Sequence, residues 1–307
     1  MGTSLLLAQL LNGVQFGVLL FLLAAGLTLV FGIMSFVNLA HGSLYMLGAY
    51  AFALVGSHTS SFAWGLLAAV ATGVVVGFVL EKTVVAKLYQ RDHLDHVLAT
   101  FGLVMFFNEV VRMLFGSQAV FVSLPDALSG TVELFGFSYP SYRFLIIAVG
   151  VLVALGSQWL IQQTRVGMLI RAGSVNPDMV GALGVNIRLL NAMLFALGAA
   201  LAALAGAMAA PILSVQSGMG EPVLITTLVV IVIGGIGSVQ GAFYASLMVG
   251  IADTLGRSYL PMLMRQVAER DVANAAGPAL ASMLIYVLMA LVLVLKPQGL
   301  FPAHKDK

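Results

Sequence analysis

The sequence contains no cysteine and few charged residues. Of its 307 residues, 14 are Lys or Arg and 12 are Asp or Glu, so 8% are charged, against about 25% in soluble domains. The lack of cysteine excludes disulfides and thiolate metal sites. The net charge of +2 provides no basic face, so nucleic acid is not expected as a partner.

Motifs for nucleotide binding and catalysis are also missing. The sequence has no G-x-x-x-x-G-K-[ST] and no Gly followed by Lys, which excludes the usual ATP-binding loop. The stretch Gly235–Gly241 approaches a dinucleotide fingerprint, but it lacks the third glycine and lies in an apolar run. No Ser-His-Asp or paired-carboxylate pattern stands out. His41 and His58 have no second histidine or carboxylate at metal-binding spacing, and His93 and His96 lie in a charged cytoplasmic segment typical of solvated histidines. We therefore expect no enzymatic activity, no catalytic residue, no cofactor and no metal.

What the sequence has is apolar surface: 61% of the residues are hydrophobic and the mean hydropathy is +1.05. A soluble core cannot absorb this much, so a lipid bilayer is the expected solvent. A spanning helix needs about 20 apolar residues. The apolar runs cover residues 5–34, 38–56, 62–81, 97–115, 143–163, 189–212, 223–252 and 278–295. The sequence predicts an all-α integral membrane protein of one domain, residues 1–307, with about eight transmembrane helices including broken or re-entrant segments.

Glycines indicate where helices break and where they pack. The run 223–252 is too long for one ordinary helix, and we expect it to divide into two pieces. The glycines of the expected break are Gly234, Gly235, Gly237 and Gly241. Elsewhere glycines lie four residues apart, at Gly13 and Gly17 and at Gly73 and Gly77. Such pairs let helix backbones approach closely in lipid.

The positive residues orient the chain, because Lys and Arg near span ends mark the cytoplasmic side. They cluster at Lys82, Lys87 and Arg91, at Arg165, Arg171 and Arg188, and in the polar tail of residues 296–307. We place these three segments inside. The loop of residues 116–142 has no Lys or Arg, and we place it outside.

A polar stretch interrupts the first third of the chain. It contains Asn38, His41, Ser43 and Tyr45, with no charged residue before Glu81. On a helix, Asn38, His41 and Tyr45 share one face. Polar residues within a membrane usually face the bundle interior or a cavity. Hydrogen bonding between helices and the lining of a translocation path both remain open.

The cytoplasmic segment of residues 164–190 carries the signals of a short helix. We expect a loop from Arg171, then a two-turn helix that starts at an Asn cap and a first-turn proline and stops at a glycine. The residues of interest are Arg171, Asn176, Pro177, Asp178, Met179, Leu183 and Gly184. So short a helix is marginal alone. It either lies on lipid or on the protein's own spans, or it docks a cytoplasmic partner.

The carboxylates give no sign of an ion-coupled carrier. Secondary transporters usually place ionisable residues within the membrane, whereas Glu81, Glu221 and Asp253 fall at the ends of the apolar runs. We expect Glu109 to pair with Arg112. A path without its own energy source points to a separate energising subunit.

Four segments carry a resemblance to a known family: residues 26–50, 171–186, 229–241 and 295–302. They resemble permease subunits of the branched-chain amino acid ABC transporters, of the LivH type, and the similarity covers nearly the whole chain. The resemblance implies a bacterial cytoplasmic (inner) membrane protein that pairs with a second permease of the LivM type. It also implies two cytoplasmic ATPase subunits that drive transport and a periplasmic binding protein that delivers the substrate.

The resemblance also implies residue roles. The loop around residues 176–184 would contact an ATPase subunit, and residues 38–45 would lie near the path between the two permeases. Similar permeases handle urea, short amides or aromatic acids, so the substrate stays open. The competing hypothesis is a stand-alone secondary transporter or channel for a small amide or amino acid.

Overall fold

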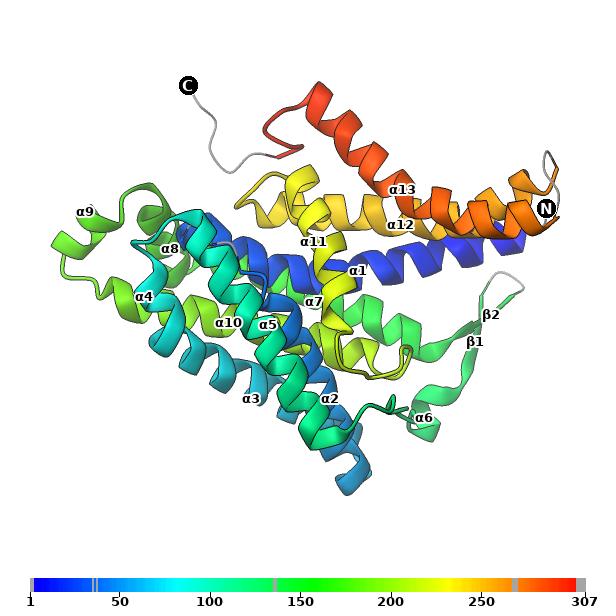
Figure 1. Cartoon of the computed structure of the whole chain (residues 1–307), viewed down its shortest axis with the longest axis horizontal. Coiled ribbons are helices and arrows are strands. Elements are labelled where there is room, and N and C mark those ends of the chain that lie inside the picture. Colours follow the sequence, from blue (N-terminus) through cyan, green and yellow to red (C-terminus); the bar gives the residue numbers. More distant parts are fainter. Residues whose placement is uncertain (1–2, 35, 37, 135–136, 267–269, 302–307) are drawn as a thin grey trace.

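The computed structural model describes residues 3–34, 36, 38–134, 137–266 and 270–301, and long helices make up most of them. Each apolar run corresponds to a helix or, for residues 223–252, to two (Figure 1). These helices are α1 (Thr3–Met34), α2 (His41–Thr59), α3 (Phe62–Leu80), α5 (His93–Phe115), α7 (Ser141–Gln163), α10 (Ile187–Ala209), α11 (Gly220–Gly234), α12 (Val239–Met264) and α13 (Arg270–Leu295). The prediction of an all-α membrane protein is confirmed.

The expected count of about eight, which included broken or re-entrant segments, is not confirmed exactly. Among the described residues, 6 single helices are long and apolar enough to cross a membrane, and the bent pair α11–α12 makes a seventh candidate if it is one span. Helix α2 is not among them. It begins only at His41, and the preceding Phe36, which is not in a helix, packs on the His96 ring at 4.7 Å between centroids.

Several short elements were not predicted. They are the π-helical turn η1 (Glu81–Val85), α4 (Ala86–Leu88), α6 (Asp126–Ser129), β1 (Thr131–Leu134), β2 (Phe137–Pro140) and α8 (Arg165–Val175). Strands β1 and β2 form an antiparallel hairpin. Helix α8 corrects the prediction of a loop from Arg171. It forms because the Thr164 hydroxyl caps the Gly167 amide at 3.0 Å and because one face is buried, at Gly167, Ile170 and Gly173.

Helix α1 is the centre of the bundle, and most of its span is buried by the rest of the chain. The glycine pairs pack as predicted. A Cβ on Gly13 or Gly17 would lie 2.7 Å from the α12 backbone, and one on Gly73 would lie 2.6 Å from the Ala199 carbonyl of α10. Helix α10 approaches α1 just as closely, at Gly26 and Gly198. Small residues therefore set the spacing of α1, α3, α10 and α12.

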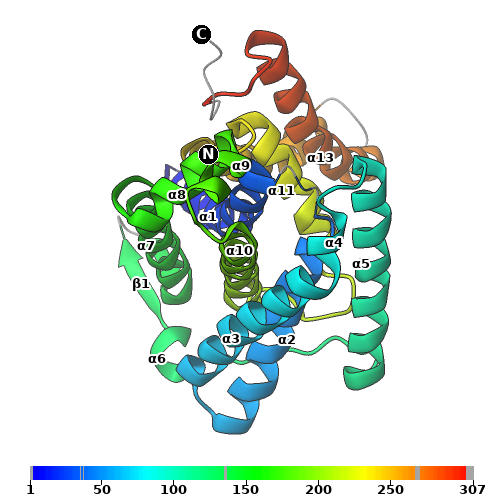
Figure 2. The same cartoon turned by 90° about the vertical axis from the view of Figure 1, so that its left-hand side faces the viewer.

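The long axis of the molecule separates two ends. Helices α4 and α8 and the short α9 (Pro177–Ala182) lie at one end, which faces the viewer in Figure 2. The β1–β2 hairpin, the C-terminal end of α12 and the start of α13 lie at the other end (Figure 1). The sequence clusters around Lys82–Arg91 and Arg165–Arg188 thus share one end, as the orientation argument requires.

Candidate functional site

The expected helix break is present between α11 and α12, which meet at an angle of 119°. Gly235 and Gly237 adopt φ values of +101° and +81°, which L side chains rarely adopt. Gly234 and Gly241 pack on each other: a Cβ on Gly234 would lie 2.5 Å from the Gly241 carbonyl carbon. The four glycines identified from the sequence therefore form the break, each for a steric reason.

The C-terminal segment closes the end of α11. The Leu300 amide donates to the Ile233 carbonyl at 2.8 Å, and the Phe301 amide donates to the Gly234 carbonyl at 3.0 Å. Gly299, with φ +84°, lies against Gly235. The last carbonyls of a helix have no partner within it and need one elsewhere when buried. The motif of residues 295–302 supplies it.

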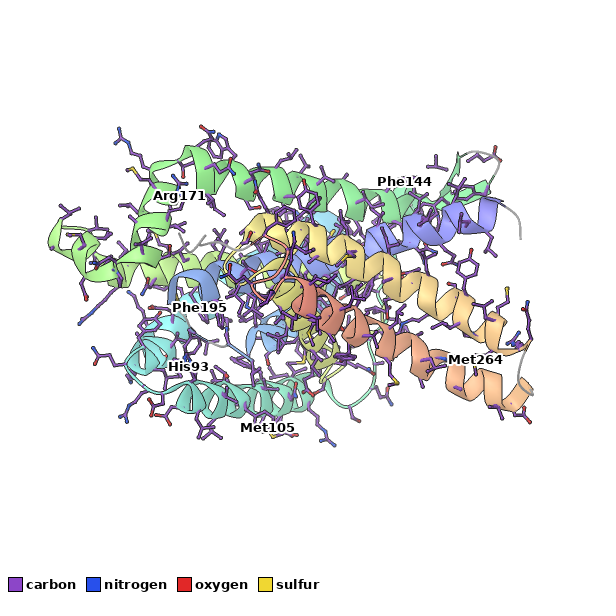
Figure 3. The ribbon with its side chains drawn as sticks, turned by 90° about the horizontal axis from the view of Figure 1, so that it is seen from above. His93, Met105, Phe144, Arg171, Phe195 and Met264 are labelled. Carbon is purple, nitrogen blue, oxygen red and sulfur yellow. The ribbon has the colours of Figure 1, made fainter. Side chains whose placement is uncertain are left out.

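A cavity of about 490 Å³ lies where the break meets α1, α7 and α8, and we call it the break cavity. Its walls are Thr28, Leu29, Gly32, Ile161, Gln162, Ile170, Arg171, Ser174, Val175, Gly237, Ser238, Val239 and Gln240. A smaller cavity of about 240 Å³ shares Val239 and Gln240 and extends along α7 and α12 past Gln158 and Tyr244. Figure 3 shows Arg171 at the end of the molecule where the chain turns from α7 into α8. Two features that are distant in the sequence, Arg171 and the glycine break, thus share one cavity.

The polar stretch lies inside the bundle. Asn38, His41, Ser43 and Tyr45 are at most 4% exposed, and none of them lines the break cavity. Asn38 precedes α2, so the prediction that it shares a helix face with His41 is wrong: helical geometry begins only at His41. Both side-chain polar atoms of Asn38 and one ring nitrogen of His41 are buried, and none of them has a hydrogen-bond partner among the residues that the structure describes.

Helix α9 has the geometry read from the sequence. The Asn176 side chain accepts from the Met179 amide at 2.9 Å, Pro177 and Asp178 form the first turn, and Gly184 has φ +88°. Val180 is buried, while Met179 and Leu183 are 61% and 77% exposed. The helix is therefore held by one side chain and presents two apolar ones outward.

A basic groove lies beside the segment that follows α9. It has a volume of about 710 Å³, and its charged and polar walls are Glu81, Lys82, Lys87, Tyr89, Gln90, Asn186 and Arg188. The Tyr89 hydroxyl donates to the Glu81 carboxylate at 2.9 Å. Burial and the nearby Glu81 carboxylate raise the pKa of Tyr89, so the phenol stays protonated and keeps this bond. Apolar α9 and the groove together form a surface at the end of the bundle.

Comparison with known proteins decides the class. Residues 9–293 match the family described as branched-chain amino acid transport system / permease component. The chain belongs to this family. The high-affinity branched-chain amino acid transport system permease protein BraD of Pseudomonas aeruginosa is 30% identical over 96% of this chain and 95% of its own length. The permease protein LivH of Salmonella typhimurium is 29% identical over 96% of this chain and 94% of its own length. The permease protein LivM of Escherichia coli is 25% identical over 93% of this chain and 68% of its own length. The chain is thus a transport component rather than an enzyme.

Most walls of the permease's break cavity were not predicted from the sequence. Thr28 lies inside a long apolar run, and Gln162 and Gln240 were passed over. One signal was available: Gln158 and Gln162 stand four residues apart, which places both amides on one face of α7. The cavity itself was not predictable, because its walls come from four separate helices.

One carboxylate of the permease was misplaced. Asp253 was expected at the end of a run, but α12 continues to Met264 and buries it. Its two oxygens accept from the Arg257 Nε at 2.9 and 2.8 Å, so it is paired. Glu109 and Arg112 pair as expected, at 3.4 Å. Within the described residues no group of three His, Asp or Glu side chains could hold a metal ion.

Proposed function

We propose that this permease carries branched-chain amino acids across a bacterial cytoplasmic membrane as one half of an ATP-driven import path. The other half is a second permease of the LivM type, two cytoplasmic ATPase subunits supply the energy, and a periplasmic protein delivers the substrate. The observation that carries the proposal is the family match over residues 9–293. The absence of a nucleotide-binding motif from the sequence requires that ATP be hydrolysed elsewhere.

Helix α9 is the proposed contact with an ATPase subunit. Its exposed Met179 and Leu183 offer an apolar knob, with Lys87 and Arg188 in the basic groove nearby. Helix α8 links α9 directly to α7 and packs on α1, which in turn packs along α12. Movement of α9 would therefore reach the helix break through packed elements. The end of the bundle that holds α4, α8 and α9 then faces the cytoplasm, and the end that holds the β1–β2 hairpin and the start of α13 faces the periplasm.

Reconstitution tests the proposal. The permease in liposomes with its second permease, the ATPases and the binding protein is expected to take up leucine only when ATP is present on the ATPase side. Omitting either permease or the ATPases should abolish uptake. Leucine uptake by this chain alone, without ATP, would instead establish the stand-alone carrier or channel.

The polar stretch is proposed to face the path in another state of the transport cycle. A buried amide without a partner costs about 1–3 kcal/mol, and Asn38 leaves both of its polar atoms unpaired here. The cost is offset if the bundle opens at this point and water or substrate reaches Asn38, His41, Ser43 and Tyr45. Polar side chains in a membrane generally serve such pathways.

Replacing Asn38 with leucine separates this role from packing. Leucine fills a similar volume, so we expect a thermal midpoint equal to or above that of the wild type and a fall in ATP-driven uptake of roughly tenfold. The measurements are uptake in proteoliposomes and thermal unfolding of the purified complex. A variant that transports at the wild-type rate would assign the stretch to packing alone.

A further inference from the structure

We propose that the break cavity binds the α-carboxylate of the transported amino acid from the cytoplasmic side. The inference rests on the proposed function for the identity of the ligand and for which side is cytoplasmic. The binding itself is argued from groups of this chain: two backbone amides, a guanidinium, a hydroxyl and an apolar wall.

Two free backbone amides lie at the start of α12. The Ser238 hydroxyl accepts from the Gly241 amide at 3.1 Å, and the Ala242 amide donates to the Ser238 carbonyl at 2.9 Å. This leaves the amides of Val239 and Gln240 without a hydrogen bond in the described part of the chain, and both residues line the cavity. The N-terminal amides and the macrodipole of a helix favour an anion.

Arg171 supplies a full positive charge. Among the described residues that line the cavity it is the one charged side chain. It donates to the Ile161 carbonyl and forms no ion pair with a described carboxylate. A guanidinium has five N–H donors in a planar fork and can hold a carboxylate through two of them. Most of these donors remain available to a ligand.

Thr28 gives independent evidence for a ligand. It is 1% exposed, it lines the cavity from α1, and its hydroxyl oxygen has no hydrogen-bond partner within the described residues. A threonine inside a helix can usually satisfy its hydroxyl on a carbonyl of the preceding turn, as Thr227 does with Val223 at 2.7 Å. Thr28 does not, so a ligand in the cavity would satisfy it.

The remaining walls match an aliphatic amino acid. Leu29, Ile170 and Val175 provide an apolar surface, whereas Gln162 and Ser174 provide acceptors for an ammonium group. The volume of about 490 Å³ lies within the range of small-molecule sites. No described wall residue is acidic, so a ligand whose only charge is positive finds no opposite charge here. A ligand with an anionic group can pair with Arg171. The combination selects a carboxylate attached to a short apolar side chain.

A site at this position has a consequence for transport. An amino acid bound between α8 and the helix break would hold together the elements through which α9 is proposed to act. Leucine inside the vesicle is therefore expected to slow further ATP-driven uptake, as product inhibition from the receiving side.

Equilibrium binding of radiolabelled L-leucine to the purified complex of both permeases and ATPases, without the binding protein, tests the inference. Leucine is expected to bind, and leucinamide, which lacks the carboxylate, to compete at least about tenfold less well. Thr28→Val preserves shape and should weaken leucine binding about tenfold at an unchanged thermal midpoint, and Arg171→Gln should weaken it further. Arg165→Gln, which removes a charge from the same helix but not from the cavity wall, should leave binding unchanged.

Other outcomes overturn the inference. These are no leucine binding, equal competition by leucinamide, unchanged binding in Thr28→Val, or displacement of leucine by inorganic phosphate at equal concentration, which would indicate a general anion site. Failure of the proposed function is distinguished by the uptake assay. A complex that imports leucine with ATP but fails the binding test refutes only the cavity site, whereas a complex that imports no branched-chain amino acid refutes the function.

Discussion

Gly26→Val is expected to leave almost no folded permease. A Cβ on Gly26 would lie 2.5 Å from the Gly198 carbonyl oxygen of α10, and one on Gly198 would lie 2.8 Å from the Gly26 carbonyl oxygen. Both obstacles are helix backbone and cannot turn aside as a side chain does. Overpacking costs about 1–3 kcal/mol where neighbours can shift. For Gly26→Val we expect a destabilisation of about 3 kcal/mol or more. The total free energy of unfolding of a protein is only about 5–15 kcal/mol.

The same substitution at Gly156 is the matched control. Gly156 lies in α7, and a Cβ there would meet nothing within 4 Å. Monodisperse yield after size-exclusion chromatography and the thermal midpoint should both fall sharply for Gly26→Val and remain close to wild type for Gly156→Val. Equal midpoints for the two variants would show that α1 and α10 do not cross at these glycines.

Met179→Asp combined with Leu183→Asp is expected to reduce ATP-driven uptake about 100-fold or more by removing the ATPase contact. An apolar anchor at the centre of an interface typically contributes about 2 kcal/mol or more to the binding free energy. The two aspartates would add the cost of burying two carboxylates in the interface. Both side chains are exposed in the isolated chain, while Val180 holds α9 in place. The fold should therefore survive. The measurements are the amount of ATPase that co-purifies with the permease and the uptake rate.

The control for this variant exchanges the two residues. Met179→Leu with Leu183→Met keeps the apolar surface and should retain ATPase binding and at least about half of the uptake, because volume-conserving apolar swaps are tolerated. Normal ATPase binding and uptake in the double aspartate variant would place α9 on lipid or on the protein's own spans, the alternative that the sequence left open.

The helices were predictable because each needs only a local signal. An apolar run of sufficient length must be helical in a membrane, and the glycines of residues 234–241 cannot continue a regular helix. The starts of helices were less predictable. Asn38 was counted into α2 because polarity alone does not distinguish a residue before the first turn from one inside it. Helix α8 was read as loop because its cap, Thr164, and two residues of its buried face, Gly167 and Ile170, precede Arg171, where the expected loop began.

The candidate site was predictable only in parts. The break and the α9 cap could be read from single stretches, since each depends on residues within one or two turns. The break cavity could not, because Thr28, Arg171 and Gln240 are brought together by the packing of α1, α8 and α12. The pairing of Asp253 with Arg257 illustrates the same limit, since burial of α12 decides how far Asp253 is from solvent.

The closure of α11 by Leu300 and Phe301 bears on how the protein is made. Ribosomes synthesise the carbonyls of Ile233 and Gly234 well before the two amides that bond them. During insertion these carbonyls must stay in contact with water or with the translocation machinery, since bare carbonyls are costly in hydrocarbon. The bend between α11 and α12 therefore reaches its final form only late in biosynthesis. A chain truncated before residue 300 would keep an open, hydrated end on α11.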